Sequence, residues 1–181
     1  MRHGETDWNV QRRIQGHSDD AGLTTRGVEQ VTATAERLVS QGATRIVSSD
    51  LIRARETALI ISRRLELTVT YDANLRERSY GELEGHSLDD LTPESSGFAH
   101  GVIVDLNAAD PGGESIAQVK DRVVGTLDRL ARDYPGETII VVTHGGVIRT
   151  LRAARSSSMI GHEWSRVDNA EIWEMSIPAE D

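Results

Sequence analysis

At residues 138–148 the chain reads TIIVVTHGGVI, and the fold can be argued outward from this stretch. Residues 138–142 form a continuous apolar run, which is typical of a central parallel strand covered on both faces. His144 and two glycines follow at once, and a helix is expected from about Val147 to Ala154. Because ligands of open α/β sheets bind beyond the carboxyl ends of the strands, His144 lies where a site is expected.

The rest of the chain alternates between strands and helices. Apolar spacing predicts helices over residues 25–41, with Gly42 as the stop, and over about 51–65, capped by Ser49 or Asp50. The clearest helix begins after Ser115 and ends at 134–136. Further strands are predicted over 45–48, 68–71 and 169–177, a loop over 74–85, one helical turn near 87–91 and irregular chain over 92–113. This order predicts one domain, residues 1–181, with an α/β fold: a three-layer α/β/α sandwich around a mostly parallel central sheet.

Composition restricts the class of protein. The 181 residues are 38% hydrophobic and 27% charged, as expected of a soluble globular domain. Aromatic residues make up only 4% and the net charge is −9, so we expect no nucleic-acid partner, and any phosphate site must be a local cationic pocket. The chain contains no cysteine, which excludes disulfides and thiolate metal sites. With no apolar run of membrane-spanning length and no visible signal peptide, we expect a cytoplasmic protein without a membrane partner.

The chain opens with Arg2 and His3 beside Gly4. A histidine with an unprotonated ring nitrogen can act as a nucleophile. The planar fork of an arginine suits phosphate oxygens. For this pair alone a flexible N-terminus is the plainer interpretation, so later stretches must decide.

Two later stretches add anion-binding groups. Arg53 and Arg55 lie at the start of a helix that follows a strand, where free N–H groups and the positive helix end favour an anion. Only one of them can face a site, because residues two apart do not share a helix face. The glycines after His144 expose backbone N–H groups, which favours a functional histidine over a satisfied core histidine.

A phosphate ester also needs a proton donor for its departing oxygen. Four carboxylates lie near the loop over 74–85, and chemistry alone leaves the choice open between Asp72, Glu77, Glu82 and Glu84. A solvated charged loop is again the plainer interpretation. Residues 111–115 similarly indicate a turn and helix cap, although Ser115 could line a cleft.

Taken together in chain order, these motifs resemble those of the histidine phosphatase superfamily, in the branch that includes the cofactor-dependent phosphoglycerate mutases. The resemblance covers essentially the whole chain, and its motifs are specific when found together in register, although each alone is modest. The matching positions are Arg2 to Thr6; Asn9, Arg13, Gln15 and Gly16; Ser49 to Leu51 with Arg53, Ala54, Thr57 and Ala58; Glu77, Gly81, Glu84 and Gly85; Thr143 to Gly146; and Asp168 to Ala170.

The resemblance implies a phosphomonoester hydrolase in which His3 attacks the ester and becomes phosphohistidine. Glu77 would protonate the leaving alkoxide and then activate water. We expect no metal and no cofactor, because cationic side chains would neutralise the phosphate instead. The substrate would be a small phosphorylated metabolite and inorganic phosphate a product. The expected catalytic residues are His3, Glu77 and His144, of which His144 would also hold the phosphoryl oxygens. The expected phosphate- and substrate-binding residues are Arg2, Asn9, Gln15, Gly16, Arg53 and Gly145.

The chain also departs from the family pattern. The opening motif of the family follows a central strand, whereas here Arg2 follows Met1, so the first central strand is expected to be missing. A short segment over 92–110 favours an open cleft that water can reach, and therefore a phosphatase over a mutase. A mutase and a non-catalytic phospho-ligand binder are the alternatives. An exposed sheet edge could pair in a homodimer or face water.

Overall fold

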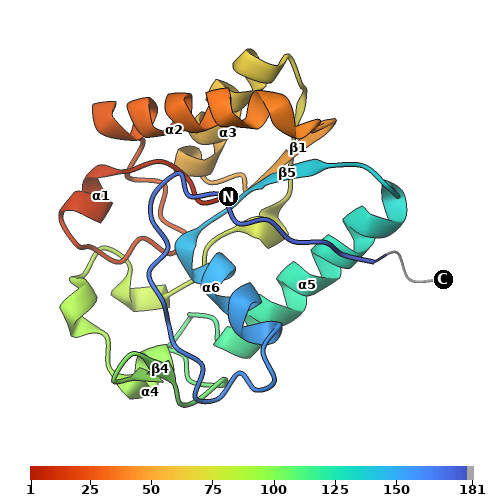
Figure 1. Ribbon diagram of the computed structural model, residues 1–181. Helices are drawn as coiled ribbons and strands as arrows, with labels where there is room; N and C mark the ends of the chain where they lie inside the picture. The colour runs from red at the N-terminus through yellow and green to blue at the C-terminus, as the bar shows by residue number, and fades with distance from the viewer. Residues whose placement is uncertain (179–181) are drawn as a thin grey trace.

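The computed structural model describes residues 1–178, and its centre is a parallel sheet of three strands (Figure 1). The strands are β1 (Arg45–Ser48), β2 (Val69–Tyr71) and β5 (Ile139–Val142), in the order β2-β1-β5. In the register of this sheet, Val47 of β1 lies opposite Thr70 on one side and Val141 on the other. The predicted mostly parallel sheet is therefore confirmed.

Helices cover both faces of the sheet, as Figure 1 shows. Because successive strand residues point to opposite faces, β5 contributes to two cores. Ile140 and Val142 pack with Ile61 and other residues of α2 (Thr25–Leu38) and α3 (Ile52–Leu65). On the other face, Val141 packs against the cluster formed by α5 (Ile116–Asp133) and α6 (Gly145–Ala154). The three-layer α/β/α sandwich follows from this alternation.

The first residues of the chain take the place beside β5. Arg2 forms a parallel bridge with Thr143, directly after the end of β5, and the backbone N–H of His3 donates to the Thr143 carbonyl at 3.0 Å. On their other side, Arg2 N–H donates to the Glu171 carbonyl at 3.1 Å. The first three residues of the given sequence pair at the carboxyl end of the sheet. That the first central strand is missing stays a prediction.

Most predicted elements are confirmed. The helix predicted over 25–41 is α2 followed by a 3₁₀ turn, η1 (Val39–Gln41), and Gly42 ends it at φ 66°. Ser115 caps α5 by accepting the Gln118 N–H. The short elements are α1 (Asp7–Val10), η2 (Ala73–Leu75), η3 (Gly81–Leu83), η4 (Leu88–Asp90), α4 (Pro93–Ser96), β3 (Phe98–Ala99) and β4 (Val102–Ile103).

The predicted last strand over 169–177 is wrong for the described residues, because this segment is extended but unpaired beyond Glu171. A strand needs a neighbour, and within this segment the backbone of the first residues bonds only to Ala170 and Glu171. The side chains still alternate as the sequence pattern indicated. Ile172 packs on the α2–α3 side of the sheet, and Trp173 packs on the α5–α6 side.

Two smaller predictions also need correction. Neither Ser49 nor Asp50 caps α3; the carboxylate of Asp19 accepts the Ile52 N–H at 2.8 Å from a separate loop. Residues 92–113 are not wholly irregular, because they contain α4 and the antiparallel pair β3–β4. Ile103 of β4 is fully buried and packs with Ile116 of α5, so tertiary packing orders this segment.

The division into one domain over residues 1–181 stays a prediction, and its last three residues lie outside the described part. Within the described residues, no helix combines the length and apolar character needed to cross a membrane.

Candidate active site

His3 is fixed in one orientation at the carboxyl end of the sheet. Its ring is buried, and Nδ1 lies 2.7 Å from the carbonyl oxygen of Gly4. Because a carbonyl can only accept, Nδ1 must carry the proton in this hydrogen bond, and Nε2 is left unprotonated with a free lone pair. Burial lowers the pKa of His3 well below its usual value, and the positive charges of Arg2 and Arg53 lower it further. The ring is therefore a neutral nucleophile with Nε2 available.

Arg2 and Arg53 supply positive charge beside this ring. Arg53 is 1% exposed and reaches back from α3 to donate to the carbonyls of Gly16 and Ser18 at 2.7 and 2.9 Å. Arg2 donates to the Val167 carbonyl at 2.7 Å. Burial lowers the pKa of each guanidinium to about 10, so both remain charged at neutral pH.

The two arginines also have unused donors. The Nε atoms of Arg2 and Arg53 are buried and have no hydrogen-bond partner in the described structure. A buried N–H of a charged group without a partner is costly, and such groups in native proteins usually await a ligand or water. Two of them beside a nucleophilic histidine indicate an anion site. Arg55, by contrast, is exposed and stacks over Tyr71, so only one of the pair faces the site, as expected.

His144 is the N-cap residue of α6 and is fully buried. Its ring centroid lies 5.2 Å from that of His3. Nε2 is hydrogen-bonded with Ser49 Oγ at 2.8 Å, whereas Nδ1 is buried without a partner. Burial lowers the pKa of His144 well below its usual value, and Arg53 and His3 lower it further. A neutral His144 can still donate through Nδ1 when Ser49 donates to Nε2.

Glu77 is the carboxylate that the fold brings to α6. Its two carboxyl oxygens accept the N–H groups of Gly146 and Arg78, both at 2.9 Å. A side chain at Gly146 would collide with this carboxyl group, which explains the second glycine of the motif. Glu77 also acts on Arg2 and Arg53. Its negative charge offsets part of the fall in pKa that burial causes in each guanidinium.

The other candidate acids have structural roles or face water. Glu84 accepts N–H groups of His17 and Tyr80 and the hydroxyl of Ser79, and so ties two loops together. Asp72 pairs with Arg129. Glu82 is exposed.

Asn9, Gln15 and Gly16 lie in the loops around the site. The Oδ1 atom of Asn9 accepts from Asn169 Nδ2 at 3.0 Å. Gln15 accepts the Thr6 hydroxyl at 3.1 Å, and Gly16 turns at φ 50° to offer its carbonyl to Arg53. Contact of these three residues with a ligand stays a prediction.

Sequence reasoning missed Arg149. Its NH2 atom and the Nε of Arg2 both lie 3.3 Å from the point where a Cβ on Gly145 would stand. The guanidinium lies 4.9 Å from the ring centroid of Trp164, and its Nε donates to the Gly145 carbonyl at 3.2 Å, but no carboxylate within residues 1–178 pairs with it. The helical spacing of four from Gly145 could have indicated it, because side chains point toward the helix N-terminus.

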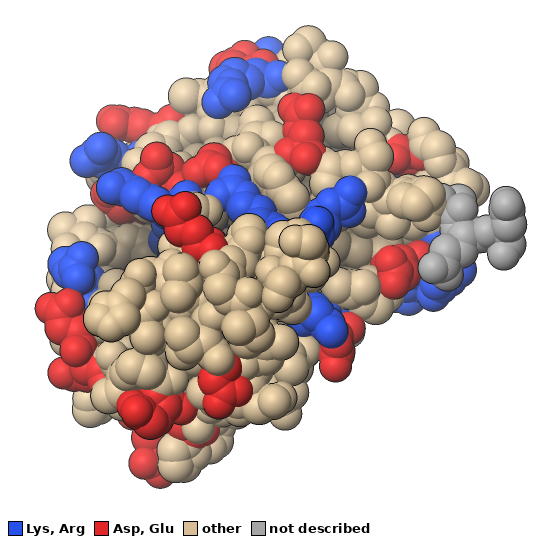
Figure 2. All heavy atoms as spheres, turned by 60° about the horizontal axis from the view of Figure 1, so that its bottom comes forward, with Lys and Arg blue, Asp and Glu red and all other residues tan. Residues whose placement is uncertain are grey.

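One face of the molecule has mixed charge. Figure 2 shows a band of cationic side chains across the middle of one face, with acidic side chains among them and acidic groups below. This mixture fits a local cationic pocket in a chain of net charge −9. Within residues 1–178, no three His, Asp or Glu side chains converge as a metal site would require.

Comparisons with known proteins agree with this geometry. Residues 1–180 match the family model of the histidine phosphatase superfamily (branch 1). A probable phosphoglycerate mutase GpmB of Salmonella paratyphi C is 40% identical over 146 residues, which are 80% of this chain and 67% of that protein.

Several solved structures are similar to this chain over most of its length. Bacillus stearothermophilus YhfR is 34% identical with a TM-score of 0.81, and the match covers 92% of this chain and 83% of that one. A mycobacterial glucosyl-3-phosphoglycerate phosphatase with VO3 is 33% identical with a TM-score of 0.80, covering 93% and 85%. A phosphoserine phosphatase variant of Entamoeba histolytica, in complex with phosphoserine, is 30% identical with a TM-score of 0.72, covering 83% and 75%.

Proposed function

The chain belongs to the histidine phosphatase superfamily (branch 1), and we therefore propose that it hydrolyses a phosphomonoester through a phosphohistidine formed on His3. The observation that carries this proposal is the hydrogen bond from His3 Nδ1 to the Gly4 carbonyl. It leaves Nε2 as the nucleophile. It also stabilises the positive charge that develops on the ring when Nε2 forms a bond to phosphorus.

The phosphoryl group would lie among three cationic or donating side chains. The unpartnered Nε–H groups of Arg2 and Arg53 would donate to its oxygens, and the unpartnered Nδ1 of His144 would do the same. These donors are fixed before the reaction, so they stabilise charge on the phosphoryl oxygens without rearranging. No metal is required for this step, because the guanidinium groups already carry the compensating charge.

Glu77 would act in both halves of the reaction. In the first, His3 Nε2 forms a bond to phosphorus, the bond from phosphorus to the alcohol oxygen breaks, and the carboxylic acid of Glu77 gives its proton to the leaving oxygen. In the second, the Glu77 carboxylate takes a proton from water as the water oxygen attacks phosphorus. The bond from phosphorus to Nε2 breaks, inorganic phosphate leaves, and both His3 and Glu77 return to their starting states.

Arg149 suggests what else the substrate carries. An arginine beside Arg2, without an ion pair in the described residues, suits a second negative group next to the ester. The names of three similar proteins contain phosphoglycerate, glucosyl-3-phosphoglycerate and phosphoserine, each a phosphate ester that bears a carboxylate. The substrate is accordingly a small phosphorylated carboxylic acid.

A mutase is the second candidate, favoured by the 40% identical relatives that are named probable phosphoglycerate mutases. A mutase must protect phosphohistidine from water until the phosphoryl group returns to substrate. The segment that could cover the site here is short, with only α4 and the β3–β4 pair between residues 92 and 113. This favours hydrolysis over phosphoryl return.

The test incubates the protein with an aryl phosphate or with 3-phosphoglycerate in the presence of EDTA. It measures the release of phosphate from each ester and the formation of the 2-phospho isomer from 3-phosphoglycerate. We expect phosphate release from both esters, abolished in His3→Ala and slowed in Glu77→Ala. Isomer formation without phosphate release would establish the mutase instead. Activity restored only by added divalent metal would contradict the metal-free mechanism.

A further inference from the structure

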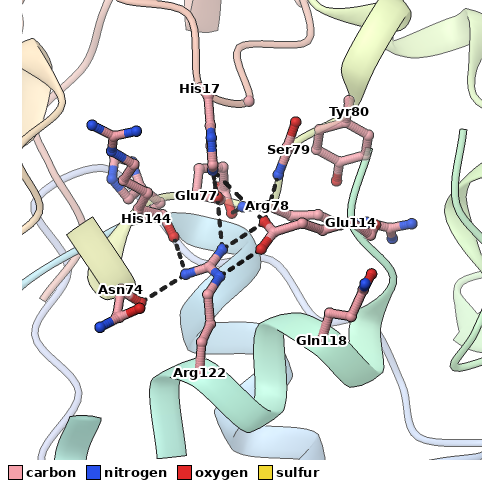
Figure 3. A network of polar contacts seen from close by, with 12 residues as sticks. His17, Asn74, Glu77, Arg78, Ser79, Tyr80, Glu114, Gln118, Arg122 and His144 are labelled. Atoms are coloured by element: carbon pink, nitrogen blue, oxygen red, sulfur yellow. Dashed lines mark hydrogen bonds and ion pairs between the residues drawn. The ribbon is translucent and has the colours of Figure 1, made fainter. Parts of the chain in front are cut away.

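Arg122 of α5 uses every N–H group that it has. Its Nε and NH2 donate to the two carboxylate oxygens of Glu114 at 2.7 and 2.8 Å. NH1 donates to the carbonyls of Asn74 and Arg76 at 2.7 and 2.8 Å, and NH2 also donates to the Glu77 carbonyl at 2.9 Å. An arginine has five N–H donors, so none is left for a ligand. Figure 3 shows the side chain rising from α5 into this network.

Glu114 binds the loop that carries Glu77 at a later residue, Ser79. Besides Arg122, its carboxylate accepts the backbone N–H of Ser79 at 2.9 Å. Burial raises the pKa of Glu114, but hydrogen bonds from Arg122 and Ser79 outweigh that effect, and the net pKa is lowered. Glu114 is therefore ionised at neutral pH. It binds the backbone at Ser79, two residues after Glu77, whereas Arg122 binds the backbone carbonyls of Asn74, Arg76 and Glu77.

The network also reaches the phosphate-binding side of the site. His17 Nε2 donates to the Glu77 carbonyl at 2.8 Å, so this carbonyl is held by two donors from different elements (Figure 3). The residues on either side of His17, Gly16 and Ser18, are the ones whose carbonyls receive the guanidinium of Arg53. The loop that carries Glu77 and the loop of residues 16–18 are thus fixed relative to each other through the backbone of Glu77.

We propose that Arg122, oriented by Glu114, is the positioning residue for the proton donor Glu77. The inference rests on the proposed function, in which Glu77 protonates the leaving oxygen. Arg122 does not contact the substrate; it fixes the backbone from which the Glu77 carboxyl reaches the N–H of Gly146. A carboxyl group displaced by about 1 Å can lose roughly 100-fold in rate, because proton transfer depends on hydrogen-bond geometry.

The test compares two esters that differ in their need for an acid. The leaving group of 4-nitrophenyl phosphate is weakly basic and departs without a proton, whereas the alkoxide of an alkyl phosphate needs one. For Arg122→Gln we expect kcat/KM to fall about 100-fold with the alkyl ester and less than about 5-fold with the aryl ester. Glu77→Gln should give the same selective pattern, and the double variant should be no worse than Glu77→Gln alone.

Matched variants separate positioning from general stability. Arg64→Gln removes an exposed ion pair between α3 and Glu36 of α2, which touches none of the residues that Arg122 binds, and should leave both kcat/KM values unchanged. Arg122→Lys keeps the charge but cannot reach Glu114 and three carbonyls at once, so we expect no rescue of the alkyl ester. If Arg122→Gln does not fold, Glu114→Gln removes the partner of the same guanidinium and should show the same selective loss.

The outcomes are distinguishable. Equal losses on both esters, or full activity of Arg122→Lys on the alkyl ester, would overturn the positioning role and leave the proposed function intact. A folded wild-type protein that hydrolyses neither ester would overturn the proposed function, and the role of Arg122 with it.

Discussion

Arg149 is the residue that most directly connects this fold to the kind of substrate it takes. Its guanidinium lies beside Arg2 and over the ring of Trp164, with no carboxylate pairing it in the described residues. The positive charge of Arg149 also contributes to the lowered pKa of Arg2, after the larger effect of burial. Two adjacent like charges are unfavourable without an anion between them, so a doubly anionic ligand relieves the repulsion.

For the variant Arg149→Gln we expect a selective loss of activity. A hydrogen bond to a charged group contributes about 1.5–3 kcal/mol, so kcat/KM for 3-phosphoglycerate should fall roughly 10- to 100-fold. Activity on glycerol 3-phosphate, which lacks the carboxylate, should change little. Arg152→Gln on the same helix is the control, because Arg152 already pairs with Glu171 at 2.6 Å. Equal losses on both esters would contradict the role of Arg149 in recognising the carboxylate.

Among single residues, the sequence predicted those whose position is set by a helix or a strand. Arg53 lies in the first turn of the helix that follows β1, and His144 is the helix cap that follows β5, so the fold brings both to the same edge of the sheet. Glu77 could not be chosen from chemistry, since only the contact with Gly146 separates it from Glu84. Arg122 and Arg149 have the sequence pattern of surface cations, and only the loops packed against them reveal their partners.

At the scale of the element, α3 shows how a helix both stabilises the fold and carries the site. Its buried face combines Ala54, Ala58 and Ile61, which pack in the core, with Arg53, which faces the site. Ile61 is fully buried, whereas Leu59 on the same helix is 40% exposed.

We expect Ile61→Ala to lower the free energy of unfolding by about 2–5 kcal/mol, since it removes buried methyl and methylene groups and leaves a cavity. Leu59→Ala should cost less than about 1 kcal/mol, because its site is open to water. Urea denaturation of both variants measures this difference. Similar losses in the two variants would show that α3 is not packed as described.

Elements were predictable where one periodicity or one cap decided them, as in β5 and α5. Residues 169–177 have the alternation of a strand but pair only through Ala170 and Glu171, because strand formation depends on a neighbour distant in sequence. The helix cap from Asp19 and the ordering of 92–113 by Ile103 likewise depend on contacts that no local pattern contains.

At the scale of the whole molecule, the buried histidines make stability depend on pH. An unfolded histidine takes up a proton near pH 6.5, whereas burial keeps the pKa of His3 and His144 well below that value. Below pH 6.5 the unfolded state therefore binds more protons than the native state, and the free energy of unfolding falls as the pH falls.

Between pH 7.5 and 5.5 each of these histidines should remove about 1 kcal/mol of stability. The variant His3→Gln should accordingly lose less stability over this range than the wild type, by about the contribution of one histidine. Urea denaturation at the two pH values measures the difference. Identical pH dependence in both proteins would show that native His3 takes up a proton as readily as the unfolded chain does.

The central claim is that Nε2 of His3 carries the phosphoryl group during turnover. The most direct measurement is a rapid alkaline quench of the enzyme with an aryl phosphate, followed by mass spectrometry of the peptide that contains His3. We predict a phosphoryl group on His3, more of it in Glu77→Gln, because water is then activated poorly, and none in His3→Ala. Turnover with no phosphorylated peptide, or with the phosphoryl group on another residue, would contradict the account.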